Sequence, residues 1–191
     1  MKTKQNDTYF ETIKCDDFEV FNLDYHKKRM ANTTGINFNL EEYIYPLNGE
    51  LLKCRVVYDR DEILDISYAP YSPREIKSFK LIFDNDIEYK YKSTDRDKID
   101  QLFSLKEDCH EIIIVKNDLI TDTSIANIAI YTDGNWYTPK TPLLPGTTRQ
   151  RYLDEGKIKE KDIDVNLFKS AEKIALLNAM VDFRIIEDFS I

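Results

Sequence analysis

The chain has 191 residues, of which 42% are hydrophobic and 12% aromatic, a composition that indicates a folded globular protein and excludes a disordered one. Its formal net charge of −8 argues against nucleic acid or an anionic membrane as the main partner, because either would repel it. The three cysteines lack CxxC spacing and only two histidines accompany them, so no zinc site can be assembled; we interpret the cysteines as reduced thiols of a cytoplasmic protein. The polar start of the sequence and the lack of a long apolar run predict a protein that is neither exported nor inserted in a membrane.

Strands dominate the first part of the predicted structure. We expect them at 9–14, 18–21, 51–58 and 63–68, where aromatic and β-branched residues lie between charged turns. Asn22 is expected to cap a helix over 23–32, which would direct Arg29 back over the first sheet. The prolines within 70–73 interrupt any regular element, and we place a boundary between two lobes there.

The second part of the chain predicts further strands with short helices between them. The strands are expected at 79–83, 112–115, 119–121, 125–131, 136–138, 174–177 and 181–186, and the helices at 96–105, 149–154 and 165–172. Ser93, Thr94 and Asp95 offer caps for the first of these helices, and residues 87–92 before them predict an exposed strand or an extended loop. Asp122 falls in the bend expected after the strand at 119–121.

The stretch 138–151, TPKTPLLPGTTRQR, predicts a tight turn followed directly by a helix. The unpaired N–H groups of the helix start, the positive end of its dipole and the hydroxyls of Thr147 and Thr148 would all point at one place, where a phosphate fits. The alternative interpretation is an ordinary helix cap after a loop. A phosphate cup at 146–148 therefore needs partners elsewhere in the chain.

Four features together supply what pyridoxal phosphate needs from a protein. The cup at 146–148 and Arg29 offer hydrogen-bond donors and positive charge to the phosphate, although a lone helical arginine is also consistent with a solvated surface charge. Lys92 offers an amine to the aldehyde, and Asp122 offers an acid that keeps the ring nitrogen protonated. The sequence therefore predicts a pyridoxal 5'-phosphate site and no metal site.

In the order of these features the sequence resembles the fold-type IV pyridoxal-phosphate enzymes, also called class IV aminotransferases. Members include branched-chain and D-amino-acid transaminases and 4-amino-4-deoxychorismate lyase. The resemblance rests on five segments: FETIKCDDFEVFNLDYHKKRM at 10–30, KSTDR at 92–96, LITDTSIANI at 119–128, TP with LLPGTTR in the phosphate loop, and LLNAM at 176–180. The second of these is similar to the Lys-x-x-Asn-Arg element of the lyase branch.

The resemblance implies an α+β protein built as two α/β lobes, with the D-amino-acid-aminotransferase-like fold. The small N-terminal lobe is expected at 1–72, and the larger lobe at 77–191 is expected to carry the Schiff-base lysine and the phosphate cup, with the cofactor between the lobes. The resemblance begins at Phe10, after a segment that the usual member carries, which implies a shortened N-terminal lobe. A homodimer is the assembly that the resemblance implies.

The resemblance also assigns roles to individual residues. Lys92 would bond the cofactor and then act as the catalytic acid and base; Lys90 competes for this role but lacks the family spacing to Arg96. The residues implied in cofactor binding are Arg29, Lys92, Asp122, Gly146, Thr147, Thr148, Asn178 and Ala179. Asp122 stands where the family usually has a glutamate, so the shorter side chain must sit closer to the ring. Thr12 and Arg55 would contact the substrate, with ordinary strand residues as the alternative interpretation.

Two reactions on a small-molecule amino substrate fit this resemblance. In the lyase, 4-amino-4-deoxychorismate gives 4-aminobenzoate and pyruvate for folate synthesis, and the Lys-x-x-x-Arg element and the compact chain favour this reaction. The alternative is a branched-chain or D-amino-acid transaminase, in which Lys92 shifts a proton from the amino acid Cα to the cofactor. A non-catalytic binding protein on the same scaffold is the further alternative, supported by the Asp122 substitution.

Overall fold

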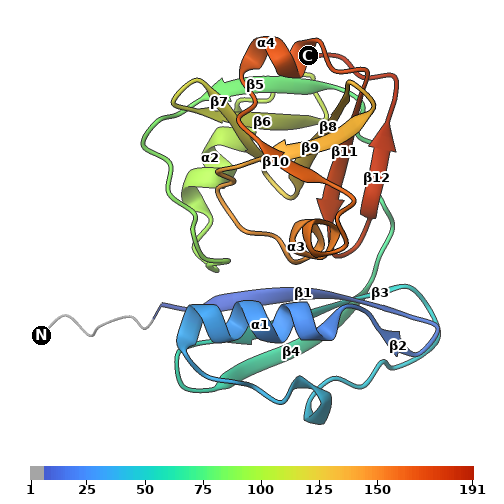
Figure 1. Cartoon of the computed structure of the whole chain (residues 1–191). Helices are drawn as coiled ribbons and strands as arrows, with labels where there is room; N and C mark the ends of the chain where they lie inside the picture. Colours follow the sequence, from blue (N-terminus) through green and yellow to red (C-terminus); the bar gives the residue numbers. More distant parts are fainter. Residues whose placement is uncertain (1–6) are drawn as a thin grey trace, which may run out of the picture. The chain divides into compact units, whose positions relative to one another are not determined.

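A computed structural model describes residues 7–191, and packing within the chain divides it into two compact units (Figure 1). Unit 1 takes in Met1–Pro73 with Tyr91–Asp95, and unit 2 takes in Arg74–Lys90 with Arg96–Ile191. Residues 1–6, whose polar sequence argues against an export signal, lie outside the described part. The lobe limits at 72 and 77 stay predictions. The segment with Lys92 packs with unit 1, whereas the sequence analysis placed this lysine in the larger lobe.

Unit 1 is an antiparallel sheet packed against one helix. In the described residues the strand order is β2-β1-β3-β4, with β1 at Tyr9–Asp16, β2 at Glu19–Val20, β3 at Leu52–Tyr58 and β4 at Ile63–Pro70. Asp17 and Phe18 have positive φ between the first two strands, which is the backbone that matches the right-handed twist of a tight hairpin. The helix α1, Leu23–Thr34, lies along the sheet, and the short 3-10 helix η1 at Leu40–Glu42 follows it (Figure 1).

The two faces of this sheet have different surroundings. Side chains of β1 and β3 alternate between them, as expected for strands with one face against a helix. One face builds a core with α1 from Ile13, Cys15, Met30, Leu40, Leu52, Cys54, Val56 and Tyr58. Glu11 is on this face and is completely buried, whereas Phe10 and Thr12 project from the opposite face of β1. β1 thus places Glu11 against α1, and it places Phe10 and Thr12 on the opposite face of the sheet.

Unit 2 holds the larger sheet. In the described residues this sheet has eight strands in the order β10-β9-β8-β7-β6-β5, with β11 paired to β8 and β12 paired to β11. The strands are β5 Phe79–Phe83, β6 Glu111–Lys116, β7 Leu119–Thr123, β8 Asn127–Thr132, β9 Asn135–Pro139, β10 Lys159–Lys161, β11 Lys173–Asn178 and β12 Asp182–Ile186. The helices are α2 Asp97–Ser104, α3 Thr147–Asp154 and α4 Val165–Lys169. No helix within residues 7–191 has both the length and the apolar character that crossing a membrane requires.

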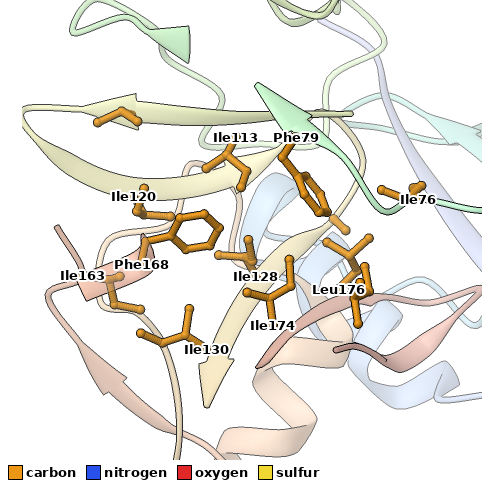
Figure 2. Close-up of a cluster of buried hydrophobic side chains, with 13 residues drawn as sticks. Ile76, Phe79, Ile113, Ile120, Ile128, Ile130, Ile163, Phe168, Ile174 and Leu176 are labelled. Atoms are coloured by element: carbon orange, nitrogen blue, oxygen red, sulfur yellow. The ribbon is translucent and has the colours of Figure 1, made fainter. Parts of the chain in front are cut away.

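An isoleucine-rich core holds the strands of unit 2 together. Figure 2 shows labelled side chains that gather from several strands, from α4 and from the segments before β5 and α4, namely Ile76, Phe79, Ile113, Ile120, Ile128, Ile130, Ile163, Phe168, Ile174 and Leu176. Each large apolar side chain buried in this way contributes about 1.5–3 kcal/mol relative to an exposed one. Ile120 and Ile128 belong to β7 and β8, so this core fixes the two strands whose ends carry Asp122 and Asn127.

Two local predictions were wrong for an identifiable reason, and two further elements differ from those expected. Helix α2 starts after Arg96 without a side-chain cap, because the Thr94 N–H and hydroxyl donate to the Thr8 carbonyl at 3.0 and 3.2 Å instead. Asp122 lies inside β7 and pairs with Asn127, because the bend forms one turn later, where the Thr123 N–H donates to Ala126 O at 2.9 Å. Helix α4 ends at Lys169, earlier than expected, and β10 was not predicted.

Candidate active site

The predicted phosphate cup lies at the start of α3 in unit 2. Gly146 precedes the helix in an extended conformation, and the Gln150 N–H donates to its carbonyl at 2.9 Å. Thr147 and Thr148 occupy the first turn and are both buried. Because the first N–H groups of a helix have no partner within it, this end of α3 offers donors to an anion.

Gly146 leaves a space that no other residue type would leave. A Cβ at this position would lie 1.9 Å from Asn127 Oδ1 and 3.0 Å from Asn127 Cγ. The Gly146 φ of −73° is open to any residue, so the glycine is required by close approach and not by backbone conformation. The loop before α3 therefore passes directly against the Asn127 amide.

Arg149 adds positive charge to the same turn of α3. Its side chain is almost fully buried, and its Nη2 donates to Pro139 O at 2.8 Å and to Glu160 Oε1 at 2.6 Å. Its Nε is buried with no hydrogen-bond partner in the described residues. Arg149 is thus a buried cation tied to β9 and β10, three residues after Gly146.

Asp122 is the buried acid of unit 2. Its Oδ1 accepts from Asn127 Nδ2 at 2.7 Å, and its Oδ2 accepts from the Leu144 N–H at 2.9 Å. Burial raises the pKa of Asp122 to about 6, although these two hydrogen bonds act in the opposite direction. Each carboxylate oxygen can accept a second hydrogen bond, so the group can still receive a protonated ring nitrogen.

Asn178 and Ala179 lie where β11 ends. Asn178 Oδ1 accepts from the N–H groups of Met180 and Val181 at 2.9 and 3.0 Å, which closes the turn into β12. Asn178 Nδ2 donates to Ile125 O at 3.4 Å and so ties this turn to the β7–β8 bend. Unit 2 thus brings the turn at Asn178 to the bend that follows Asp122.

Lys92 and Arg55 meet on one aromatic ring in unit 1, the ring of Phe10. The Lys92 carbonyl accepts from the Phe10 N–H at 2.9 Å, and its Nζ lies 4.6 Å from the centroid of the Phe10 ring. The Arg55 guanidinium carbon lies 3.9 Å from the same centroid. Thr12 is directly opposite Arg55 in the β1–β3 pairing, so the two side chains project from the same face.

Arg29 is held by a buried acid on the opposite face of the same sheet. Its Nε donates to Glu11 Oε1 at 2.9 Å, and its Nη2 donates to Glu11 Oε2. His26 Nδ1 is 2.6 Å from Glu11 Oε2, and both of these side chains are fully buried. The bidentate pairing fixes the plane and direction of the Arg29 guanidinium.

The charges of this cluster follow from burial and from contact. Burial alone would raise the pKa of Glu11, but the Arg29 charge and the hydrogen bonds from His26 and Arg29 outweigh it and lower the pKa to about 2. Burial lowers the pKa of His26, so the ring is neutral and donates from Nδ1 to the carboxylate. Glu11 is therefore an anion that faces one arginine and one neutral histidine.

The predicted site residues divide between the two units. Thr12, Arg29, Arg55 and Lys92 belong to unit 1, and Asp122, Gly146, Thr147, Thr148, Asn178 and Ala179 belong to unit 2. Within unit 2, Arg96 Nη2 donates to Ser124 O at 2.9 Å, at the β7–β8 bend. Each unit carries part of the set that the sequence predicts, and the assignment of these residues to one site stays a prediction.

Comparison with known proteins decides the family. A model of the family described as amino-transferase class IV matches residues 61–189. The chain belongs to the class IV aminotransferases. A Haemophilus influenzae protein without an assigned function is 35% identical to this class IV aminotransferase over 182 residues, which cover 90% of the chain and 96% of that protein.

Solved structures of similar proteins share the fold. A Haemophilus somnus 129pt structure, provisionally named 4-amino-4-deoxychorismate lyase, is 30% identical with a TM-score of 0.85, and the match covers 93% of this chain and 98% of that one. A hypothetical aminotransferase from Mycobacterium tuberculosis in its PLP-bound form has a TM-score of 0.79 at 15% identity, covering 97% and 82% of the two chains. The predicted α+β fold of the fold-type IV enzymes is confirmed, and so is the family resemblance.

Sequence reasoning missed three residues that shape this class IV aminotransferase. Glu11 holds Arg29 and is itself bonded by His26, and Asn127 contacts both Asp122 and the loop before α3. A signal existed for Glu11, since it is a charged residue among the otherwise apolar core-facing positions of β1. Asn127 was visible only as part of a family segment, because nothing in the sequence shows that its amide meets the loop at Leu144, 17 residues further on.

Proposed function

We propose that this class IV aminotransferase is a pyridoxal-phosphate-dependent 4-amino-4-deoxychorismate lyase. It would convert 4-amino-4-deoxychorismate to 4-aminobenzoate and pyruvate, a step of folate synthesis. The cofactor part of the proposal is carried by the Gly146 cradle, where the chain leaves no room for a Cβ beside the start of α3. The lyase part is supported by the 30% identical relative that is provisionally named for this reaction.

The predicted residues would each suit one group of the cofactor. Thr147, Thr148 and the N–H groups at the start of α3 would hold the phosphate, together with Arg29. Asp122 would accept a hydrogen bond from the ring nitrogen, and Asn178 and Ala179 would border the phosphate. Pyridoxal phosphate, when bound, supplies an electron sink conjugated with the amino group of the substrate.

Lys92 would perform the proton transfers. Its Nζ would hold the cofactor through the aldehyde, and the Lys92 amine would remove the proton from the ring carbon that bears the substrate amine. The C–O bond to the enolpyruvyl group breaks, the electron pair completes the aromatic ring, and the leaving group takes a proton to become pyruvate. Arg55 would bind a substrate carboxylate, with Thr12 beside it on the same face of the sheet.

To test the lyase, the protein is first loaded with pyridoxal phosphate. It is then given 4-amino-4-deoxychorismate, with no keto acid present. We expect 4-aminobenzoate and pyruvate to appear in equal amounts. A protein that shows the visible absorbance of a lysine-bound cofactor but releases neither product would support the transaminase, to be tested with a panel of L- and D-amino acids. A protein whose spectrum does not change with the cofactor would support the non-catalytic binding protein.

The proposal extends to a cytoplasmic homodimer, which the family resemblance implies. The chain mass is 22.5 kDa, so light scattering on the purified protein is expected to give about twice this value for a dimer. A mass equal to that of one chain across the micromolar range would contradict the dimer while leaving the cofactor proposal in place.

A further inference from the structure

We infer that Asn127 is a positioning residue for the phosphate cup. Asn127 and Asp122 together clamp the backbone of Leu144, which holds the cup in shape. The inference deepens the proposed function and rests on it, since the ligand of the cup is taken to be the phosphate of the cofactor. It assigns to Asp122 a second partner besides the cofactor ring, namely the loop that carries the cup.

The clamp consists of three hydrogen bonds, two to the backbone of Leu144 and one between the two side chains that hold it. Asn127 Nδ2 donates to Leu144 O at 2.8 Å and to Asp122 Oδ1 at 2.7 Å. The Leu144 N–H donates to Asp122 Oδ2 at 2.9 Å. The backbone N–H and C=O of Leu144 are therefore both satisfied by side chains, as a neighbouring strand would satisfy them in a sheet.

The Asn127 amide also sets the distance between the clamp and the cup. Its two N–H groups have acceptors in Asp122 and Leu144, so its oxygen must face the other way, toward Gly146. That oxygen lies 1.9 Å from where a Gly146 Cβ would be. One amide thus contacts the loop at two points, two residues apart, immediately before the helix that offers its N–H groups.

The clamp is mounted on a rigid support. Asp122 and Asn127 are paired across β7 and β8, and the bend between them is closed by the Thr123 hydroxyl, which accepts from the N–H groups of Ile125 and Ala126 at 3.2 and 2.9 Å. The Leu144 side chain packs against the apolar cluster that includes Ile99 and Ile112. Because the loop is ordered in advance, binding an anion costs less conformational entropy.

The test compares two ligands that differ only in the phosphate, pyridoxal phosphate and pyridoxal. Affinities are measured from the visible absorbance of the lysine-bound ligand for wild type, Asn127→Ala and Gly146→Ala. Wild type is expected to prefer pyridoxal phosphate. Asn127→Ala removes the donor to Leu144 O, and Gly146→Ala adds a methyl group that pushes the loop away from the Asn127 amide. Each variant is therefore expected to lower the affinity for pyridoxal phosphate by about tenfold or more, while the affinity for pyridoxal stays within about twofold of wild type.

Control variants and unfolding curves separate positioning from general damage. Lys140→Ala changes an exposed residue of the same loop and should keep the wild-type preference. If Asn127→Ala retains the preference for phosphate, or loses both ligands equally, the inference is overturned and the proposed function stands. If wild type binds neither ligand, the proposed function and this inference fall together. Should Asn127→Ala fail to fold, Gly146→Ala gives the same decision, because its clash is confined to the loop and the amide.

Discussion

Lys92→Ala is expected to lower the rate of 4-aminobenzoate release by about a thousandfold or more, with the fold intact. The substitution removes the amine that we propose as both the bond to the cofactor and the carrier of the proton, and general acid–base catalysis alone contributes about 10²–10⁴-fold. The backbone contact of this residue is unaffected, since the Lys92 carbonyl still accepts from the Phe10 N–H. The measurement is the initial rate of product release with saturating cofactor, beside a thermal unfolding curve.

Lys90→Ala is the matched control for this variant. Lys90 is an exposed lysine two positions earlier, and the family spacing to Arg96 is met by Lys92 alone of the two. The Lys90 variant should keep the wild-type rate, and the Lys92 variant should also lose the visible absorbance that pyridoxal phosphate gains on bonding a lysine. Added methylamine is expected to restore part of the rate to the Lys92 variant, because a free amine can replace the missing base. If the Lys90 variant is the inactive one, the assignment of the catalytic lysine is wrong.

The strands were predictable because their signals are local. Apolar residues with a period of two and acidic turns gave β1, β3 and β5 within one or two residues, and the hairpin turn at Asp17 and Phe18 uses residues next to each other in the chain. The cap of α2 was not predictable in this way. Ser93, Thr94 and Asp95 all have the right chemistry, but Thr94 bonds to Thr8, which lies 86 residues away.

In the candidate site, too, residues with a local sequence signal could be predicted, whereas contacts between distant residues could not. The identities of Lys92, Asp122 and the cup followed from spacing and from family resemblance, and their roles stay predictions. The ion pair between Glu11 and Arg29 joins residues 18 positions apart and depends on α1 packing across β1. The sequence pattern does not specify this packing. Likewise, a sequence shows that an asparagine follows Asp122 by five positions, but not that its amide meets a glycine in a loop further along.

Glu11→Gln is expected to lower the free energy of unfolding at neutral pH by about 3 kcal/mol. The variant keeps the size of the side chain and removes its charge, so Arg29 and His26 remain buried around a neutral amide. Breaking one side of a buried ion pair costs about 3–5 kcal/mol, since the remaining charge has no partner. The linkage gives a similar figure: lowering the Glu11 pKa from 4.5 to about 2 corresponds to about 3 kcal/mol.

The pH dependence distinguishes this charge effect from a packing defect. The pKa of Glu11 in the folded protein is below its ordinary value, so its contribution is complete above about pH 4.5 and is lost as the pH falls toward 2. The difference between wild type and Glu11→Gln should therefore be constant from pH 7 to about pH 5 and should shrink in stronger acid. Urea unfolding at each pH measures it, with Glu41→Gln, an exposed acid that pairs with Lys27, as the control that should behave like wild type.

A difference that stays the same down to about pH 3 would mean that the glutamine disturbs packing and that the charge of Glu11 contributes little. Asp122 provides an internal contrast, because burial raises its pKa to about 6 and its effect has the opposite sign: stability from this group increases as the pH falls from about 6 toward 3.8. Asp122→Asn should therefore remove an increase in stability that wild type shows as the pH falls, whereas Glu11→Gln should remove a decrease in stability. The two buried carboxylates, one in each unit, thus change stability with pH in opposite directions. The reason is that Glu11 has an arginine against both oxygens, whereas the hydrogen-bond donors to Asp122 are neutral.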